Sequence, residues 1–250
     1  MTRDLPTERP TRRALLGAFG LLGLGAALGR HAHFARAGTA PRLFAFVPAL
    51  ESTRAVDEIL SRGLPGISLT AFGRFADFSA AVLSEKPEGA LAPMETLRVL
   101  GVTPQLQGEA GGSTQEAYVV LSKDPSDSLE ALARKAIGVV DIVGRAELPA
   151  LLKRLLGLQD PPTVKRVLKI SDLLPLLHLD LAPAVTLPER FLTEFQQLSR
   201  MSLRVLRRTT ASMGRMAVGF PAGQVERGVA SALQKAPPNV FRLLGVEAFR

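Results

Sequence analysis

Residues 42–50 read RLFAFVPAL, and this short apolar run broken by a proline is typical of a buried β-strand. Ser52 or Thr53 then offers the N-cap of a helix that stops at Gly63. Further along, the pattern predicts a strand at 66–72, a helix at 75–83, a strand at 89–92 and a helix that opens at Pro93. Strands that alternate with helices in this way predict a parallel sheet with right-handed crossovers.

The middle of the chain repeats this alternation. Strands are expected at 102–107, 117–122, 137–143, 164–170 and 203–208, and helices at 129–135, 144–156, 173–179 and 193–201. The apolar run 216–221 is expected to return to the first sheet. The sequence therefore predicts two α/β lobes, the first built from residues 38–117 and 215–250 and the second from residues 118–214.

Several passages resemble a known family when they are taken in order. They are the opening strand 43–50 with its helix 52–60, FADFSAAVL at 75–83, EGALAP at 88–93, and PNVFRLLGVEAF at 238–249. The set resembles the type II periplasmic substrate-binding proteins, most nearly the branch that takes up phosphate, phosphite and phosphonate. This resemblance implies two lobes, each a mostly parallel sheet flanked by helices, with a small ligand between them. It also implies a membrane partner, either an ABC permease or a sensor, and no cofactor.

In such a fold the loops at the ends of the strands and the starts of the helices face the cleft, where unpaired N–H groups suit an anion. Ser52 is expected either to cap its helix or to donate to a ligand oxygen. Arg74 and Arg145 are candidates for bidentate contact with an anion. The full set of expected ligand contacts is Ala49, Leu50, Ser52, Arg74, Pro93, Met94, Tyr118 and Arg145.

The chain also departs from the phosphonate-binding pattern. The turn after the strand 137–143 reads GRAEL and carries no hydroxyl, whereas the family has a turn rich in serine and threonine there. Glu51 and Glu95 would repel a dianion unless each is paired with a cation. The identity of the ligand stays open. A second alternative also stays open, namely that the chain is an interaction protein of the same fold that binds no ligand.

An enzyme is the less favoured alternative. The sequence has no cysteine and only one histidine, His178, beyond residue 37, which excludes thiolate and histidine-rich metal sites. It also has no Gly-x-Ser-x-Gly motif. Asp141, Asp172 and Asp180 are expected to be helix caps or acids at strand ends.

The first 37 residues have the layout of an export signal. Arg12 and Arg13 precede the uncharged run 14–29, and Ala35-Arg36-Ala37 forms a small-x-small cleavage pattern. The paired arginines indicate the twin-arginine route, with the Sec route and a permanent anchor as alternatives. We therefore expect a mature periplasmic protein that begins near Gly38.

Removal of the leader halves the positive charge. The whole chain has 31 Lys and Arg against 23 Asp and Glu, a formal charge of +8, and the leader holds six arginines and two acids, so the mature chain of 213 residues carries +4. With one Tyr and no Trp, the chain also lacks the stacking aromatics of a nucleic-acid-binding surface. We expect a monomer that does not bind nucleic acid.

Overall fold

The structure is a computed structural model that describes residues 40–124, 131, 135–209 and 211–250. The predicted export signal and most of the helix expected at 129–135 lie outside the described residues.

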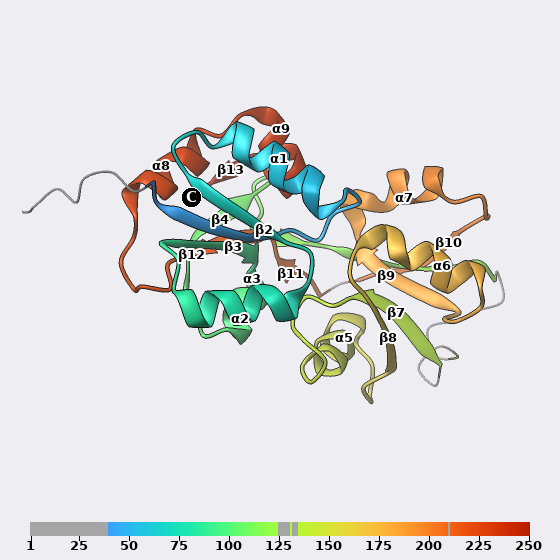
Figure 1. The fold of residues 1–250 in the computed structure, drawn as a ribbon. Coiled ribbons are helices and arrows are strands. Elements are labelled where there is room, and N and C mark those ends of the chain that lie inside the picture. The colour runs from blue at the N-terminus through green and yellow to red at the C-terminus, as the bar shows by residue number, and fades with distance from the viewer. Residues whose placement is uncertain (1–39, 125–130, 132–134, 210) are drawn as a thin grey trace, which may run out of the picture. The chain divides into compact units, whose positions relative to one another are not determined.

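The first sheet has the strand order β13-β4-β12-β3-β1-β2 (Figure 1). Strand β1 pairs in parallel with β2 and β3, whereas β12 runs antiparallel to both β3 and β4. Strand β12 is the returning strand expected at 216–221, and its pairing confirms that expectation. The strands are β1 (Arg42–Phe46), β2 (Ser68–Phe72), β3 (Gly89–Pro93), β4 (Pro104–Glu109), β12 (Met216–Gly219) and β13 (Ala248–Phe249).

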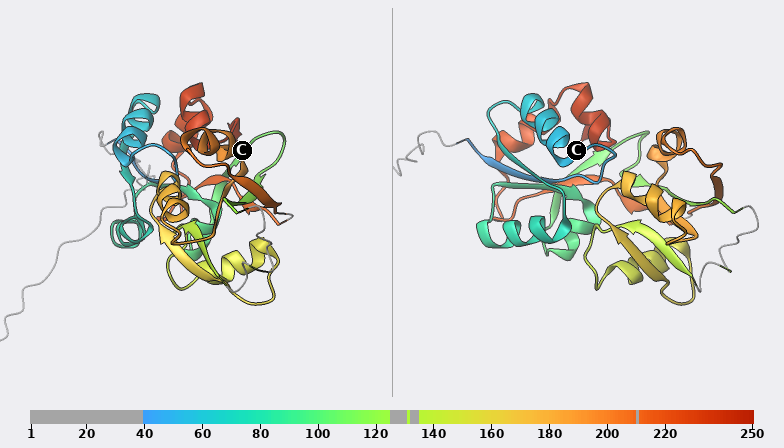
Figure 2. Two further views of the ribbon diagram at one scale, coloured as in Figure 1. Left: turned by 90° about the vertical axis from the view of Figure 1, so that its right-hand side faces the viewer. Right: turned by 45° about the vertical axis from the view of Figure 1, so that its right-hand side comes forward.

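Helices cover both faces of this sheet, as Figure 2 shows. Helices α1 (Thr53–Gly63), α8 (Arg227–Gln234) and α9 (Pro238–Leu244) lie on one face, and α2 (Phe75–Glu85) and α3 (Met94–Val99) lie on the other. The alternation of side chains along β1 explains this arrangement. Leu43 and Ala45 belong to the core beneath α1, α8 and α9, whereas Phe44 and Phe46 pack in a second core with residues of α2 and α3.

The second sheet has the order β10-β6-β9-β7-β8, and only β6 runs against the other strands. Its strands are β6 (Tyr118–Ser122), β7 (Ala136–Val140), β8 (Thr163–Val167), β9 (Ala184–Pro188) and β10 (Arg204–Arg208). The helices in this part are α5 (Leu148–Leu156), η1 (Ile170–Asp172), α6 (Leu173–His178), η2 (Glu189–Phe191) and α7 (Leu192–Leu198). The two sheets, mostly parallel and flanked by helices, confirm the predicted fold class.

The strands predicted for the second sheet need correction, and the helix expected at 144–156 begins at Leu148. Strand β9 lies within the second sheet and is buried along its whole length, although no strand is predicted there from the sequence. Strand β7 ends at Val140 and β8 at Val167, earlier than the predicted ends at 143 and 170. The residues after both strands therefore belong to turns, where they are available to form a site.

Two chain segments connect the sheets. Between β4 and β6 lies β5 (Gln115–Glu116), which pairs antiparallel with β11 (Met213–Gly214), between β10 and β12. The division into lobes at residues 117/118 and 214/215 stays a prediction. Among the residues described here, no helix is both long enough and apolar enough to cross a membrane.

Candidate ligand-binding site

A pocket of about 440 Å³ opens where the carboxyl ends of β1 and β2 meet the turn after β8. We call it the mouth pocket. It lies between elements of the two sheets, because Ala49 and Arg74 come from the first part and Lys169 from the second. Its lining is Val47, Ala49, Glu51, Ser52, Thr53, Val56, Phe72, Gly73, Arg74, Asp77, Leu168, Lys169 and Asp172.

Two helices begin at the mouth pocket. The Ser52 hydroxyl accepts a hydrogen bond of 3.3 Å from the Ala55 N–H, so Ser52 is the N-cap of α1, which is one of the two roles predicted for it. Helix α2 begins after Arg74 and has no side-chain cap. The first amides of a helix have no partner within that helix, and together with the helix dipole they favour a negatively charged group. The two helix starts therefore favour an anionic group in this pocket.

The charged side chains of the mouth pocket have mixed sign. The Arg74 Nε lies 3.9 Å from an Asp77 carboxylate oxygen, and the Lys169 Nζ lies 3.7 Å from an Asp172 oxygen. Both ion pairs are long, and their side chains are more than a third exposed. Asp77 and Asp172 therefore hold Arg74 and Lys169 only weakly. Glu51 is exposed, and within the described part of the chain it forms no ion pair. The pocket offers two cations for a ligand but surrounds them with three acids.

A much smaller cavity of about 20 Å³ lies beside the mouth pocket. We call it the inner cavity. Most of its lining side chains are apolar, and Tyr118 and Thr186 contribute the hydroxyl groups. The lining is Pro48, Tyr118, Val139, Val140, Ile142, Leu148, Leu151, Leu152, Leu155, Ile170, Thr186, Pro188 and Met213.

The two hydroxyl-bearing residues of the inner cavity sit in an apolar setting. Thr186 is 1 % exposed, and its Oγ1 has no hydrogen-bond partner among the described residues. Burial of the phenol raises the pKa of Tyr118 far above its ordinary value, and the negative charge of Glu116 adds to this effect. The phenol is therefore neutral at all physiological pH values, and the inner cavity carries no charge of its own.

A few direct contacts join the elements around the two sheets. The Ile170 N–H donates to the Ala49 carbonyl oxygen over 3.3 Å, and the Thr96 hydroxyl donates to the Ile142 carbonyl oxygen over 2.6 Å. Gly144, at φ 85°, approaches the Phe75 ring so closely that a Cβ atom would lie 2.8 Å from it. A side chain at position 144 would therefore disturb this contact.

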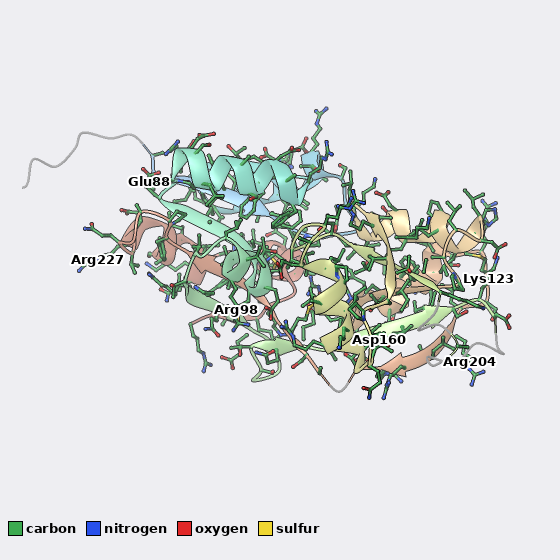
Figure 3. The ribbon with its side chains drawn as sticks, turned by 90° about the horizontal axis from the view of Figure 1, so that it is seen from below. Glu88, Arg98, Lys123, Asp160, Arg204 and Arg227 are labelled. Atoms are coloured by element: carbon green, nitrogen blue, oxygen red, sulfur yellow. The ribbon has the colours of Figure 1, made fainter. Side chains whose placement is uncertain are left out.

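Glu95 also takes part in these contacts. Its carboxylate lies 3.0 Å from Arg98, labelled in Figure 3, and 3.6 Å from Arg154, which follows the second sheet's β7 along the chain. The Glu95 side chain is only 12 % exposed. Two cations therefore offset the repulsion that Glu95 is expected to exert on an anion. Among the described residues, no ion pair offsets the repulsion expected from Glu51.

A buried group of charges lies at the connection between the sheets. Glu116 is 6 % exposed and pairs with Arg190 and, over 3.4 Å, with Arg215. Arg215 also donates to the Gly245 carbonyl oxygen over 3.0 Å, which links the residue between β11 and β12 to the C-cap of α9. The Arg190 guanidinium lies 4.4 Å from the centre of the Phe191 ring. This group is packed beside Tyr118 and lines neither pocket.

The predicted contact residues fall into separate places. Ala49, Ser52 and Arg74 line the mouth pocket, and Tyr118 lines the inner cavity. Leu50 is partly buried against the core, and Pro93 and Met94 are buried outside both spaces. Arg145 is exposed and lines neither space. The role of each of these residues in ligand binding stays a prediction.

The three aspartates expected to be helix caps or acids at strand ends have structural partners. Asp141 accepts from the Gly144 N–H over 2.7 Å and pairs with Arg166 over 2.8 Å, so it closes the turn after β7. Asp180 pairs with Lys123 over 2.6 Å. Only Asp172 of the three lines the mouth pocket. Among the residues described here, no group of three or more His, Cys, Asp or Glu could hold a metal ion.

Sequence reasoning did not identify Lys169 and Thr186 as candidate site residues. The predicted strand ran to residue 170, which placed Lys169 within a strand, whereas β8 ends at Val167 and leaves Lys169 in the turn. Thr186 lies in β9, the strand that was not predicted. The proline that ends this strand, Pro188, is a signal that could have identified it, because Pro93 ends β3 in the same way.

Comparison with known proteins gives a clear result for the fold alone. No family model matches the sequence, and neither does any curated protein. Among solved structures, a binding-protein component of an ABC phosphonate transporter from Pseudomonas aeruginosa is similar, with a TM-score of 0.63 and 11 % identity over 85 % of this chain and 82 % of that one.

Two further solved structures are similar at the same level. XAC2383 from Xanthomonas citri, bound to ATP, has a TM-score of 0.57 and 14 % identity over 85 % of this chain and 91 % of its own. The periplasmic VFT2 domain of Bordetella pertussis BvgS has a TM-score of 0.53 and 15 % identity over 82 % of this chain and 93 % of that one. The chain therefore has the fold of the type II periplasmic binding proteins, which confirms the resemblance noted in its sequence.

Proposed function

We propose that this protein is an exported solute-binding protein that captures a small solute with an ionised acidic group between its two lobes. The observation that carries the proposal is the mouth pocket, where the starts of α1 and α2 and the cations Arg74 and Lys169 converge on one space of about 440 Å³. Pockets of this size accommodate small solutes. A phosphonate, a phosphite or another oxyanion is the ligand class that we propose.

The proposed location and partner follow from the same reasoning. The leader with Arg12-Arg13 and the Ala35-Arg36-Ala37 pattern supports export to the periplasm with cleavage near Ala37. A soluble receptor of this fold would deliver its solute to a membrane ABC permease or report it to a membrane sensor. The fold supports this partner only by analogy.

One observation favours the second candidate, an interaction protein of the same fold that binds no solute. Glu51, Asp77 and Asp172 outnumber the two cations of the mouth pocket. An anion that enters must therefore gain more from the helix starts and from Arg74 than it loses to the acids. Direct binding measurements separate the two candidates.

The experiment is a thermal-shift screen of the protein with phosphate, phosphite, methylphosphonate, methanesulfonate, acetate, glycine and glucose. A ligand present at 100 times its dissociation constant stabilises the native state by about 2.7 kcal/mol. We expect a rise in Tm with at least one acid. The Arg74→Ala substitution should raise the dissociation constant of this ligand about tenfold or more, because a hydrogen bond to a charged group contributes about 1.5–3 kcal/mol.

The matched control is Arg227→Ala, which removes an exposed arginine at the start of α8 that lines neither space (Figure 3). It should leave binding unchanged. A shift with glucose alone overturns the choice of an acidic ligand. No shift with any of the seven compounds favours the interaction protein.

A further inference from the structure

A groove of about 420 Å³ lies where the end of α6 meets the end of α7 (Figure 1). We call it the outer groove. Its described lining shares no residue with that of the mouth pocket or of the inner cavity. Five of the eight lining residues are apolar, which is the composition of a site for a small, mostly apolar molecule. The lining is Leu174, Pro175, His178, Leu179, Leu198, Ser199, Arg200 and Met201.

Exposed leucine side chains gather at the outer groove. Leu179 is 62 % exposed and Leu198 is 53 % exposed, and both line the groove. Leu181, two residues beyond Leu179, is 50 % exposed. Single exposed apolar residues are ordinary on a protein surface, but several at one place mark a site of interaction. An apolar group bound here would therefore shield these leucines from water.

The charge of the outer groove is positive. Among the described residues that line it, Arg200 is the single charged side chain. Arg200 is exposed and, within the described part of the chain, forms no ion pair. The next acid along the chain from Leu179 is Asp180, which pairs with Lys123 over 2.6 Å. The Arg200 guanidinium is thus free to bind a carboxylate, which it can do through two parallel hydrogen bonds.

The ends of the two helices do not offset this charge. The carbonyl groups at a helix C-terminus carry partial negative charge when they have no partner. At the end of α6, the Leu176 carbonyl oxygen accepts from the Leu181 N–H over 2.9 Å. At the end of α7, the Phe195 carbonyl oxygen accepts from the Ser199 N–H over 3.1 Å. Because these oxygens are occupied, the full charge of Arg200 decides which sign of ligand is favoured.

We propose that the outer groove is a second ligand site, which binds a fatty acid of medium chain length such as octanoate or decanoate. The carboxylate meets Arg200. The alkyl chain covers Leu179 and Leu198 and reaches Met201. The volume of the groove lies within the range of small-molecule sites, about 300–1,000 Å³, so an acyl chain is favoured over a protein partner. This site is separate from that of the proposed function and does not depend on it.

Methionine methyl groups report on binding at this site. Of the four methionines that the structure describes, Met201 lines the outer groove, whereas Met94, Met213 and Met216 are buried. The protein, labelled with ¹³C at its methionine methyl groups, is titrated with octanoate and decanoate and followed by NMR, and Met201→Leu assigns the signal. We expect a saturable shift of the Met201 signal, while the signals of the three buried methionines stay unchanged.

The length of the chain sets the expected affinity. Each methylene group contributes a factor of up to about four when it is fully buried, and somewhat less in a groove that is open on one side. Decanoate should therefore bind about 4–16 times more tightly than octanoate.

Substitution of Arg200 tests the contact with the head group. Arg200→Ala should raise the dissociation constant of decanoate about three- to tenfold, because an exposed charge-assisted contact is lost. Arg200→Glu should reverse the preference, so that decyltrimethylammonium binds more tightly than decanoate. The matched control is Arg227→Ala, which removes an exposed arginine that lines none of the three spaces and should leave the binding of decanoate unchanged.

Three outcomes would overturn this inference. The first is a Met201 signal that does not shift with either fatty acid. The second is equal affinity for decanoate, decanol and decyltrimethylammonium, or an affinity for decanoate that Arg200→Ala leaves unchanged. The third is a Met201 signal that changes with protein concentration alone, since a second copy of the chain would then occupy the groove. The mouth pocket is tested separately by the thermal-shift screen, so the proposed function stands or falls independently.

Discussion

The mouth pocket and the inner cavity share two chain segments, 47–49 and 168–172, yet they differ in volume, charge and exposure. The mouth pocket has about 440 Å³ and five charged side chains, whereas the inner cavity has about 20 Å³ and none. Leu168 at the mouth is 49 % exposed, while Leu148 in the inner cavity is 0 % exposed. The difference teaches that the charges proposed to recognise a ligand and the side chains that stabilise the fold occupy separate neighbouring places.

This separation has a consequence for mutation. Exposed charges such as Arg74 and Lys169 contribute little to stability, so the side chains of the mouth pocket can be changed at a small cost in stability. Close-packed apolar side chains respond to the loss of even one methylene group. The inner cavity therefore resists change more strongly, and three measurements test this contrast.

The largest expected effect is the loss of a leucine from the inner cavity. Leu148→Ala should lower the free energy of unfolding by about 2–5 kcal/mol, because it removes buried methyl groups and leaves a void. The matched variant at the mouth, Leu168→Ala, should change it by no more than about 0.5 kcal/mol. Urea unfolding followed by circular dichroism measures both. Similar losses for the two variants would contradict the contrast.

A pair of buried threonines gives the next largest effect. Thr96 is 0 % exposed and donates to Ile142, so Thr96→Val should destabilise the protein by about 1–2 kcal/mol. Thr186→Val removes a hydroxyl without a partner among the described residues, so it should leave stability unchanged or raise it by about 1 kcal/mol.

Thermal unfolding of the two valine variants beside the parent protein provides the comparison. A marked loss of stability in Thr186→Val would mean that this hydroxyl has a partner, such as a buried water molecule. The inner cavity would then be more polar than its lining side chains alone make it.

The smallest expected effect is spectroscopic. The chain has one tyrosine, so ultraviolet absorbance of phenolate reports on Tyr118 alone. Because burial raises the pKa of Tyr118, the folded protein should show no phenolate at pH 10–11, where an exposed tyrosine ionises. Titration of the native and the urea-unfolded protein makes the comparison, and an ordinary midpoint in the native protein would place the phenol in water.

The sign of the effect on stability follows from linkage. The pKa of Tyr118 is higher in the folded than in the unfolded state, so its contribution is complete below about pH 10 and falls as the pH rises above that value. Stability should therefore decline in alkaline solution beyond the decline seen for a Tyr118→Phe variant.

Local sequence patterns predicted much of the fold. The apolar run of β1, the Ser52 cap of α1 and the start of α2 follow from residues next to one another in the chain. The alternation of strands and helices along the chain predicted two α/β lobes, and the resemblance to the binding proteins implied the same. Strand β9 was missed because its five residues, AVTLP, give neither an alternating pattern nor a long apolar run.

The candidate site was predicted only in part. Ala49, Ser52 and Arg74 follow predicted strands, so their meeting at one edge of the first sheet was foreseeable. Lys169 and Asp172 come to the same pocket because β8 is shorter than its apolar pattern indicates. The inner cavity brings together Pro48, Tyr118, Leu148 and Thr186, and contacts between such distant segments leave no trace in local periodicity.

A crystal structure of the protein grown with methylphosphonate tests the central claim most directly. We expect the phosphonate group in the mouth pocket, at the starts of α1 and α2 and beside Arg74 and Lys169. A phosphonate group that lies outside the mouth pocket, or a crystal with no bound phosphonate, would contradict the proposed function.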